Sequence, residues 1–260
     1  MESTIAILLG IIQGITEFLP ISSSGHLVIV KDLLRIETGY DFLFNIFVHL
    51  GTLCAIIFYF YDDIRKILRG VSSGNKESYH YIFLIFLATL PVALIGLFYN
   101  DKIKSLSNIE FASYCLIFTG VILFLSKYAK EKSIKLSYLD VILIGLFQAI
   151  AILPGISRSG MTISVALFLG VNRNEASKLS FFMAIPAIIG AATLEVLKIN
   201  SLDYINLMNL AIGFIISAII GYFSISWLIK LINKLHFWKF SFYVWSLGLI
   251  ILILDYYGCS

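Results

Sequence analysis

Two stretches of this 260-residue chain decide its fold. The first runs from Gln13 to His26 with the sequence QGITEFLPISSSGH, and the second runs from Gln148 to Thr162 with the sequence QAIAILPGISRSGMT. Each lies inside a long apolar run and carries proline, glycine and polar residues at its middle. Proline removes a backbone donor and clashes with the preceding turn, and glycine adds conformational freedom. We therefore interpret each stretch as two helices joined by a break.

The two stretches also match each other. The same residue types recur 135 positions apart in four pairs: Gln13 and Gln148, Ser22 and Ser157, Ser24 and Ser159, Gly25 and Gly160. The match predicts an internal duplication, with repeat 1 at about residues 1–126 and repeat 2 at about 136–260. Membrane folds that have broken helices at corresponding positions of two halves often place their site where the breaks meet.

The composition identifies an integral membrane protein. Hydrophobic residues make up 59% of the chain and charged residues 13%, whereas globular domains carry about 25% charged residues. The mean hydropathy is +0.93. Residues 204–229 contain no Asp, Glu, Lys or Arg, and about 20 apolar residues span a bilayer. These values exclude a soluble enzyme, a disordered chain and a nucleic-acid binder.

Eight apolar segments are predicted to be helices, at about residues 3–30, 42–60, 80–99, 111–126, 139–169, 179–197, 204–229 and 240–256. Only helices and closed barrels satisfy the backbone in lipid. If the two broken segments, 3–30 and 139–169, re-enter the membrane, one side receives thirteen loop lysines and arginines and the other five. Because cytoplasmic loops are rich in these residues, we expect six transmembrane helices, two re-entrant helix hairpins in an inverted repeat, and extracytoplasmic termini.

Polar residues of the first stretch suggest a site. An ionisable residue inside a membrane segment, such as Glu17, is costly and functional by default, although a protonated or wet carboxyl is the alternative. Ser22, Ser23 and Ser24 follow the break, where a half-helix would begin. Such a helix start binds anions, although the serines could instead only cap the helix.

Histidine is the side chain that titrates near neutral pH. His26 follows the three serines and a glycine, so it is a candidate base, acid, nucleophile or metal ligand. The other three histidines have no comparable polar neighbours, and we interpret them as packing or interfacial residues: His49, His80 and His236.

In the second stretch, Arg158 is the only Lys or Arg outside the loops, and it is flanked by Ser157 and Ser159 with Thr162 one turn later. A guanidinium binds phosphate oxygens bidentately. The alternative is a structural partner for Glu17 across the two hairpins. The combined set suits phosphoryl chemistry, in which positioning and charge stabilisation supply most of the catalysis. Walker-type, HExxH and CxxC motifs do not occur in the sequence.

With these residues in view, the two stretches resemble the signature motifs of the bacterial undecaprenyl-diphosphate phosphatases of the bacitracin-resistance type. The stretch from Arg173 to Ala176 extends the likeness over nearly the whole chain. The resemblance implies hydrolysis of undecaprenyl diphosphate to undecaprenyl phosphate and inorganic phosphate in the bacterial cell membrane. This reaction recycles the lipid carrier of peptidoglycan synthesis and lowers the amount of bacitracin's target. The resemblance also implies an extracytoplasmic site and a divalent cation, Mg²⁺ or Ca²⁺.

The resemblance assigns roles residue by residue. It implies catalytic roles for Glu17, His26 and Ser23, with Glu17 either a metal ligand or the group that orients His26. It implies phosphate binding by Ser22, Ser157, Arg158, Ser159 and Thr162. Gln13 stands where the family often has Glu, so it is a poor candidate for metal binding or base catalysis.

Several alternatives stay open at this point. His26 or Ser23 attacks the terminal phosphorus, or His26 activates water. Segments 42–60, 80–99, 179–197 and 204–229 are expected to form an apolar groove for the polyprenyl tail. A lipid-phosphate transporter or flippase is the alternative function, because inverted repeats with broken helices are transporter architecture. The sequence does not decide between a monomer and a homodimer.

Overall fold

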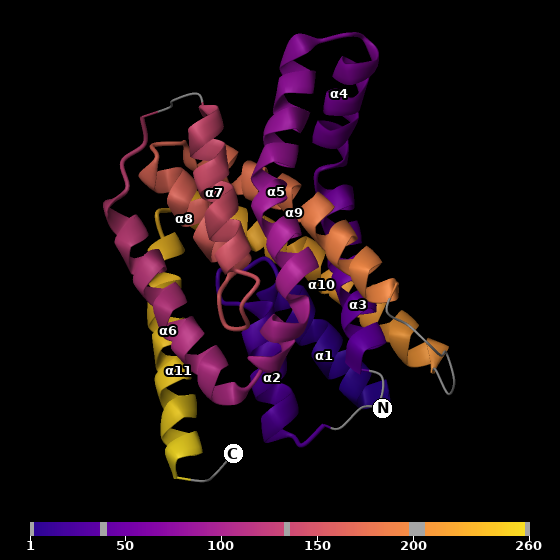
Figure 1. Cartoon of the computed structure of the whole chain (residues 1–260), viewed down its shortest axis with the longest axis vertical. Coiled ribbons are helices and arrows are strands. Elements are labelled where there is room, and N and C mark those ends of the chain that lie inside the picture. The colour runs from indigo at the N-terminus through magenta and orange to yellow at the C-terminus, as the bar shows by residue number, and fades with distance from the viewer. Residues whose placement is uncertain (1–2, 37–40, 133–135, 198–205, 258–260) are drawn as a thin grey trace.

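The computed structural model describes residues 3–36, 41–132, 136–197 and 206–257, and every regular element in these ranges is a helix. Figure 1 shows the arrangement of α1 (Ser3–Thr16), α2 (Ser23–Leu33), α3 (Asp41–Tyr59), α4 (Tyr61–Ser72), α5 (Lys76–Ser105), α6 (Ile109–Leu125), η1 (Ser126–Tyr128), α7 (Tyr138–Ile150), α8 (Arg158–Phe168), α9 (Arg173–Val196), α10 (Leu207–Asn233), η2 (Phe237–Lys239) and α11 (Phe240–Tyr256). The predicted all-α, polytopic membrane fold is confirmed.

Both broken segments form helical hairpins. The first consists of α1 and α2, and the second of α7 and α8. With 14 and 13 residues, α1 and α7 are each about 20 Å long at 1.5 Å per residue, which is too short for a hydrocarbon core of about 30 Å. Ser22 and Ser157, 135 positions apart, cap α2 and α8 by accepting from Gly25 N at 3.2 Å and Gly160 N at 3.1 Å.

The six segments predicted to cross the membrane correspond to α3, α5, α6, α9, α10 and α11. Five of these helices are long and apolar enough to span a membrane. The sixth, α3, is long and apolar enough together with α4, and the two helices are bent by 74° where they meet. Residues 204 and 205 of one predicted segment, and the counted lysines Lys135 and Lys198, lie outside the described residues.

The chain after residue 60, which we expected to be a charged loop, is instead the helix α4. Asp62 and Asp63 lie in its first turn and Arg69 in its last, an order that complements the helix dipole. The helix packs against α5, and the two rise beyond the other helices in Figure 1. A charged stretch with helical periodicity therefore extends the bundle at this end.

The two hairpins pack in corresponding ways. α1 packs against α10, and α7 packs against α5. A Cβ on Gly10 would lie 3.1 Å from Gly213 O, and one on Gly145, 135 positions later, would lie 2.4 Å from Ala88 O. Such close backbone approaches are typical of membrane helix interfaces. The correspondence agrees with an internal duplication, whose boundaries stay a prediction.

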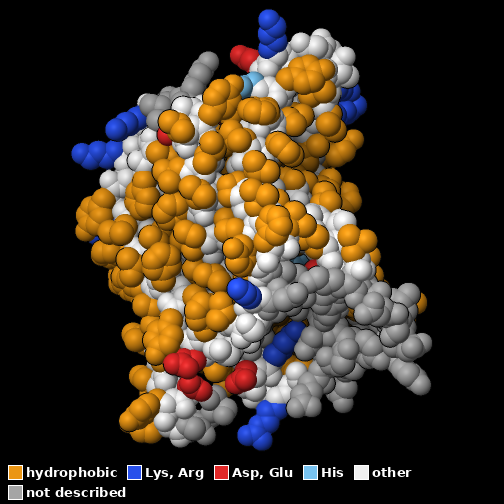
Figure 2. All heavy atoms as spheres, in the orientation of Figure 1, with side chains coloured by type: hydrophobic (Ala, Val, Ile, Leu, Met, Phe, Trp, Pro, Cys, Tyr) orange, Lys and Arg blue, Asp and Glu red, His pale blue; other side chains and the backbone are white. Residues whose placement is uncertain are grey.

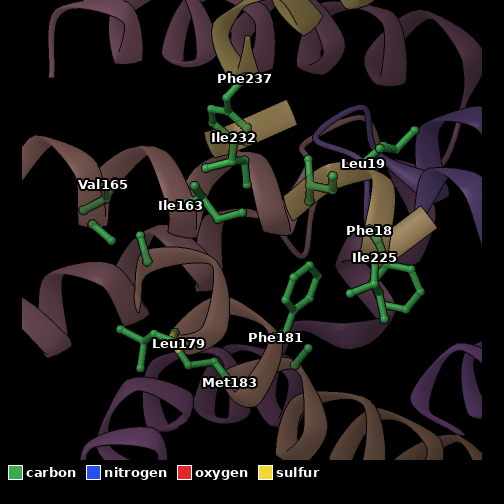
Figure 3. Packing of buried hydrophobic residues seen from close by; sticks show 14 of the residues in the cluster. Phe18, Leu19, Ile163, Val165, Leu179, Phe181, Met183, Ile225, Ile232 and Phe237 are labelled. Atoms are coloured by element: carbon green, nitrogen blue, oxygen red, sulfur yellow. The ribbon is translucent and has the colours of Figure 1, made fainter. Parts of the chain in front are cut away.

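The breaks of the hairpins are buried in the apolar interior. Phe18, in the first break, packs edge-on against Phe181 of α9, with ring centroids 5.7 Å apart. Figure 3 shows Phe18 and Phe181 together with Ile225 of α10. Gly25 approaches Gly155 closely, since a Cβ on Gly25 would lie 2.9 Å from Gly155 Cα. The two polar stretches are therefore adjacent, near the middle of the molecule (Figure 1).

The outer surface suits lipid. In Figure 2 hydrophobic side chains cover the visible sides of the molecule, and the charged side chains lie mainly toward its ends. Exposed aromatic and aliphatic residues of α5 illustrate this: Phe83, Phe86, Leu94, Leu97 and Phe98. The exposed apolar surface is that of a multi-pass membrane protein.

Candidate active site

The centre of the site is an ion pair between the two hairpins. Arg158, the first residue of α8, donates from Nη2 to Glu17 Oε1. The Glu17 side chain is 5% exposed and that of Arg158 is 18% exposed. The expectation that the acid of one stretch meets the guanidinium of the other is confirmed. This contact also fits the structural alternative for Arg158, so the arginine both joins the hairpins and faces the site.

The second oxygen of Glu17 has three polar neighbours. Oε2 accepts hydrogen bonds from Ser23 Oγ at 2.6 Å and from Gln13 Nε2 at 3.0 Å. His49 Nε2 lies 3.7 Å from the same oxygen. Glu17 is therefore held by groups from α1, α2, α3 and α8. Fixed partners of this kind orient a carboxylate for chemistry.

A cavity of about 400 Å³ opens beside this cluster. Its polar lining includes Glu17, Ser22, Ser23, Ser24, Asn45, His49, Ser107, Gln148, Ser157, Arg158 and Glu195, and its apolar lining includes Ile46, Val92, Ile152, Ile156, Ala187, Ile188, Ala191 and Ala192. The serines lie at the starts of α2 and α8, where backbone N–H groups have no partner within the helix. A polar pocket with two helix starts and an apolar wall suits an anionic group on a lipid.

Five of the predicted site residues line this cavity: Glu17, Ser22, Ser23, Ser157 and Arg158. Ser22 and Ser157 also cap their helices. The alternative that the serines of the first stretch only cap the helix is therefore too narrow, because Ser22 both caps α2 and lines the cavity, and Ser157 does the same at α8.

Three predicted residues do not line the cavity. The His26 ring donates from Nδ1 to Ser22 O at 2.8 Å, and its Nε2 bonds Tyr243 OH at 2.8 Å. Ser159 Oγ donates to Leu19 O at 3.2 Å. Thr162 Oγ1 donates to Arg158 O at 2.8 Å, and it lies 2.7 Å from Ser180 Oγ. All three are buried and bonded to other protein groups. They therefore hold neighbouring parts of the site in place and do not face the cavity.

Sequence reasoning missed six polar lining residues: Thr16, Asn45, His49, Ser107, Gln148 and Glu195. The interpretation of His49 as a packing or interfacial residue is wrong, because the side chain faces Glu17. A signal was present, since Asn45 and His49 lie one helical turn apart in an apolar segment and therefore share one face. His80 does pack as expected, edge-on against Tyr138 with centroids 5.6 Å apart.

The donors of the cavity set limits on a metal ion. Among the described residues, no group of three or more His, Cys, Asp or Glu side chains could hold one. The cavity offers the Glu17 carboxylate, the serine hydroxyls and Gln148, whose buried Oε1 has no hydrogen-bond partner in the described part of the chain. Mg²⁺ commonly binds one or two carboxylates together with substrate phosphates. The donor set therefore fits a cation shared with a bound phosphate.

Comparison with known proteins gives consistent matches along the chain. A family model described as bacitracin resistance protein BacA matches residues 6–250. The undecaprenyl-diphosphatase of Carboxydothermus hydrogenoformans is 40% identical over 271 residues, which cover 99% of each chain. That of Methanobrevibacter smithii is 36% identical over 270 residues, 96% of this chain and 97% of the relative. That of Thermosipho africanus is 45% identical over 207 residues, 78% of this chain and 83% of the relative.

Proposed function

The chain belongs to the family of the bacitracin resistance protein BacA, and we propose that it hydrolyses undecaprenyl diphosphate to undecaprenyl phosphate and inorganic phosphate. The reaction recycles the lipid carrier of the cell wall and thereby confers bacitracin resistance. The observation that carries the proposal is the Glu17–Arg158 pair beside Ser23 in a cavity between membrane helices. It combines a cation for the diphosphate, a carboxylate and a hydroxyl.

Substrate binding changes the partner of Arg158. The guanidinium lines the cavity while it pairs with Glu17. A diphosphate brings more negative charge than one carboxylate, and guanidinium binds phosphate oxygens bidentately. Arg158 therefore transfers to the terminal phosphate, which also meets the N–H groups at the starts of α2 and α8. Ser22 and Ser157 both line the cavity.

Ser23 is the nucleophile in this proposal. Its Oγ donates to Glu17 Oε2 at 2.6 Å, so the carboxylate accepts the proton once Arg158 has turned to the phosphate. Oγ attacks the terminal phosphorus, the bond from that phosphorus to the bridging oxygen breaks, and undecaprenyl phosphate leaves with the electron pair. Water then attacks the phosphoserine, inorganic phosphate leaves, and Glu17 returns the proton to Ser23.

The remaining predicted residues act through their neighbours in this proposal. His26 holds Ser22 through its backbone carbonyl, and Ser159 joins α8 to the first hairpin at Leu19. Thr162 donates a hydrogen bond to Arg158 O and so stabilises the first turn of α8. These contacts support positioning roles, while direct catalysis by His26 and direct phosphate binding by Ser159 and Thr162 stay predictions.

A divalent cation, Mg²⁺ or Ca²⁺, is part of the proposal. Glu17 and the oxygens of the bound diphosphate would hold it, and when bound it would neutralise charge on the phosphates. This arrangement predicts that EDTA abolishes phosphate release and that added Mg²⁺ or Ca²⁺ restores it. It also predicts weak cation binding in the absence of a diphosphate.

We propose an extracytoplasmic site in the bacterial cell membrane, with extracytoplasmic termini. Three basic segments are linked at one end of the molecule: Lys178 pairs with Asp63 of α4, Arg173 pairs with Glu131, and Lys127 lies 4.7 Å from the Trp238 ring. The cavity includes Ile103 and Glu195, which lie near the opposite ends of α5 and α9. Because basic residues favour the cytoplasmic side, the cavity faces the other side.

The polyprenyl tail leaves the cavity between α3 and α9 in this proposal. A second cavity of about 260 Å³ is lined by Leu50, Ile189, Ala192, Thr193, Val196 and Leu197. Ala192 lines both cavities, so an apolar path continues from the phosphate site toward the lipid. Two of the four segments expected to form the tail groove contribute, and each CH₂ buried there adds about 0.8 kcal/mol.

The test is phosphate release from undecaprenyl diphosphate by the purified protein in detergent. Wild-type protein is expected to release phosphate, and Ser23→Ala to release none. Ser164→Ala is the matched control, because Ser164 is buried in α8 and its Oγ bonds no other described group. A folded wild-type protein that releases no phosphate would favour the transporter, an alternative that the named relatives do not favour.

A further inference from the structure

A tyrosine of the last helix is bonded to the first hairpin. Tyr243 lies near the start of α11, and its hydroxyl bonds His26 Nε2 at 2.8 Å. The two rings are stacked, with centroids 5.7 Å apart and planes 9° from parallel. Because α11 packs mainly on α6 (Figure 1), this contact ties a helix outside both hairpins to the one that carries Glu17 and Ser23. Neither the two signature stretches nor the resemblance assigns Tyr243 a role.

The ring of His26 continues this contact to Ser22. Nδ1 lies 2.8 Å from Ser22 O, and a carbonyl oxygen only accepts, so Nδ1 is the donor. The same carbonyl also accepts from the backbone N–H of His26 at 3.2 Å. A tyrosine hydroxyl can donate or accept, so the bond between Tyr243 and Nε2 forms in either protonation state of the ring. The imidazole is therefore held at both nitrogens, between α11 and the start of α2.

The backbone of Ser22 is strained and depends on its contacts. Its φ is +67°, a value that residues with a side chain rarely adopt. Such conformations persist where the surrounding structure holds them. The carbonyl to which His26 donates belongs to this residue, and it shares one planar peptide with the N–H of Ser23. Holding the carbonyl oxygen therefore also fixes the direction of that N–H and the place where Ser23 begins α2.

We propose that Tyr243 is a positioning residue for the reaction, acting through His26 on the peptide between Ser22 and Ser23. The tyrosine holds the imidazole, the imidazole holds the Ser22 carbonyl, and this peptide sets the position of Ser23 Oγ beside Glu17. Tyr243 itself does not line the cavity, so it acts on the reaction only through these neighbours. The inference rests on the proposed diphosphatase function, in which Ser23 is the nucleophile, and adds to it a residue of α11.

The experiment measures kcat and KM for undecaprenyl diphosphate in Tyr243→Phe, in His26→Asn and in the double variant. Tyr243→Phe removes the hydroxyl and leaves the ring, which is 47% exposed, so the packing of α11 is kept. His26→Asn places an amide nitrogen near the position of Nδ1, so it keeps a donor for Ser22 O and loses the contact with Tyr243. Melting temperatures in detergent show whether each variant is folded.

We expect Tyr243→Phe to lower kcat about tenfold and to leave KM unchanged, because Ser23 is displaced while Arg158 still binds the phosphate. Tyr222→Phe is the matched control. Tyr222 is 42% exposed in α10, and its ring packs edge-on against Tyr59 with centroids 5.4 Å apart. It does not line the cavity, so Tyr222→Phe keeps the wild-type kcat and KM.

The outcomes separate this inference from the function on which it rests. The double variant should have the kcat of His26→Asn, because both changes break the same contact. If the two losses multiply instead, Tyr243 does not act through His26 and the inference is overturned. A folded Tyr243→Phe with the wild-type kcat overturns it while the diphosphatase stands. If His26→Asn is inactive, a lower kcat with unchanged KM in Tyr243→Phe supports the inference by itself. If wild-type protein releases no phosphate, the diphosphatase is wrong and this role falls with it.

Discussion

Arg158 and Glu17 are 141 positions apart in the chain, and they form an ion pair where the two hairpins meet. Each belongs to a hairpin whose individual helices are too short to cross the bilayer. The pair therefore joins two structural units and places their polar residues in one cavity. A buried ion pair is weak evidence for stability. Because this pair lies beside Ser23, however, a bound phosphate can replace Glu17 as the partner of Arg158.

Breaking the pair has different effects on folding and on activity. We expect Arg158→Gln to destabilise the protein by about 3–5 kcal/mol, because it leaves the Glu17 carboxylate buried and unpaired. The double variant Glu17→Gln with Arg158→Gln removes both charges, so its melting temperature in detergent should recover most of the loss. Phosphate release stays absent in both. A double variant no more stable than Arg158→Gln would contradict the ion pair as the cause.

The stereochemistry at phosphorus tests Ser23. Two in-line displacements, first by Ser23 and then by water, give net retention at a chiral terminal phosphorus. We expect retention when a substrate whose terminal group is a chiral thiophosphate with two oxygen isotopes is hydrolysed in water of the third isotope, and the configuration of the released inorganic thiophosphate is analysed. Net inversion would mean that water attacks directly, and Ser23 would then only orient Glu17.

Much of the fold followed from the sequence because lipid leaves few choices for the backbone. Long apolar runs could only be helices, and the prolines and glycines at their middles marked the breaks. The 135-residue offset correctly related the capping serines, Ser22 and Ser157. The helix α4 was missed because its charged residues suit a loop as well as an amphipathic helix, and packing against α5 decides between the two.

The site was predictable only in part, for a physical reason. Sequence spacing shows which residues share a hairpin, but it does not show where each side chain points. His26 stands next to three serines in the chain, yet its ring turns away to Tyr243 of α11. His49 stands in a different segment, yet it reaches Glu17. The spacing of Asn45 and His49 shows that they share one face of α3, but only tertiary packing turns that face toward Glu17. A homodimer likewise has no signature in the chain.

Cysteine labelling tests the orientation. In a variant whose native cysteines are replaced, Ser105→Cys at the end of α5 and Ser73→Cys after α4 are both exposed positions. A membrane-impermeant maleimide added to intact cells is expected to label Ser105→Cys, and to label Ser73→Cys only after the membrane is opened. The reverse pattern would place the cavity on the cytoplasmic side.

A close backbone approach between α7 of the second hairpin and α5 predicts a large effect of one methyl group. Gly145→Ala places a Cβ 2.4 Å from the backbone oxygen of Ala88, so α7 must move away from α5. We expect a loss of about 1–3 kcal/mol, measured as a lower melting temperature in detergent. Gly190→Ala is the control, because its Cβ would meet no atom within 4 Å. An equal loss in both variants would point to glycine flexibility instead of packing.

Ala192 offers a test of the tail path, because its side chain borders both cavities. Ala192→Trp should obstruct the junction and displace the chain next to the diphosphate. We expect kcat/KM for undecaprenyl diphosphate to fall about tenfold, as for the loss of two buried CH₂ groups at about 0.8 kcal/mol each. A five-carbon prenyl diphosphate, too short to pass the junction, should be hydrolysed as by wild type. Ala211→Trp adds the same bulk on an exposed position of α10 and should change neither rate. If Ala192→Trp slows both substrates equally, the tail leaves by another route and the tryptophan disturbs the phosphate site itself.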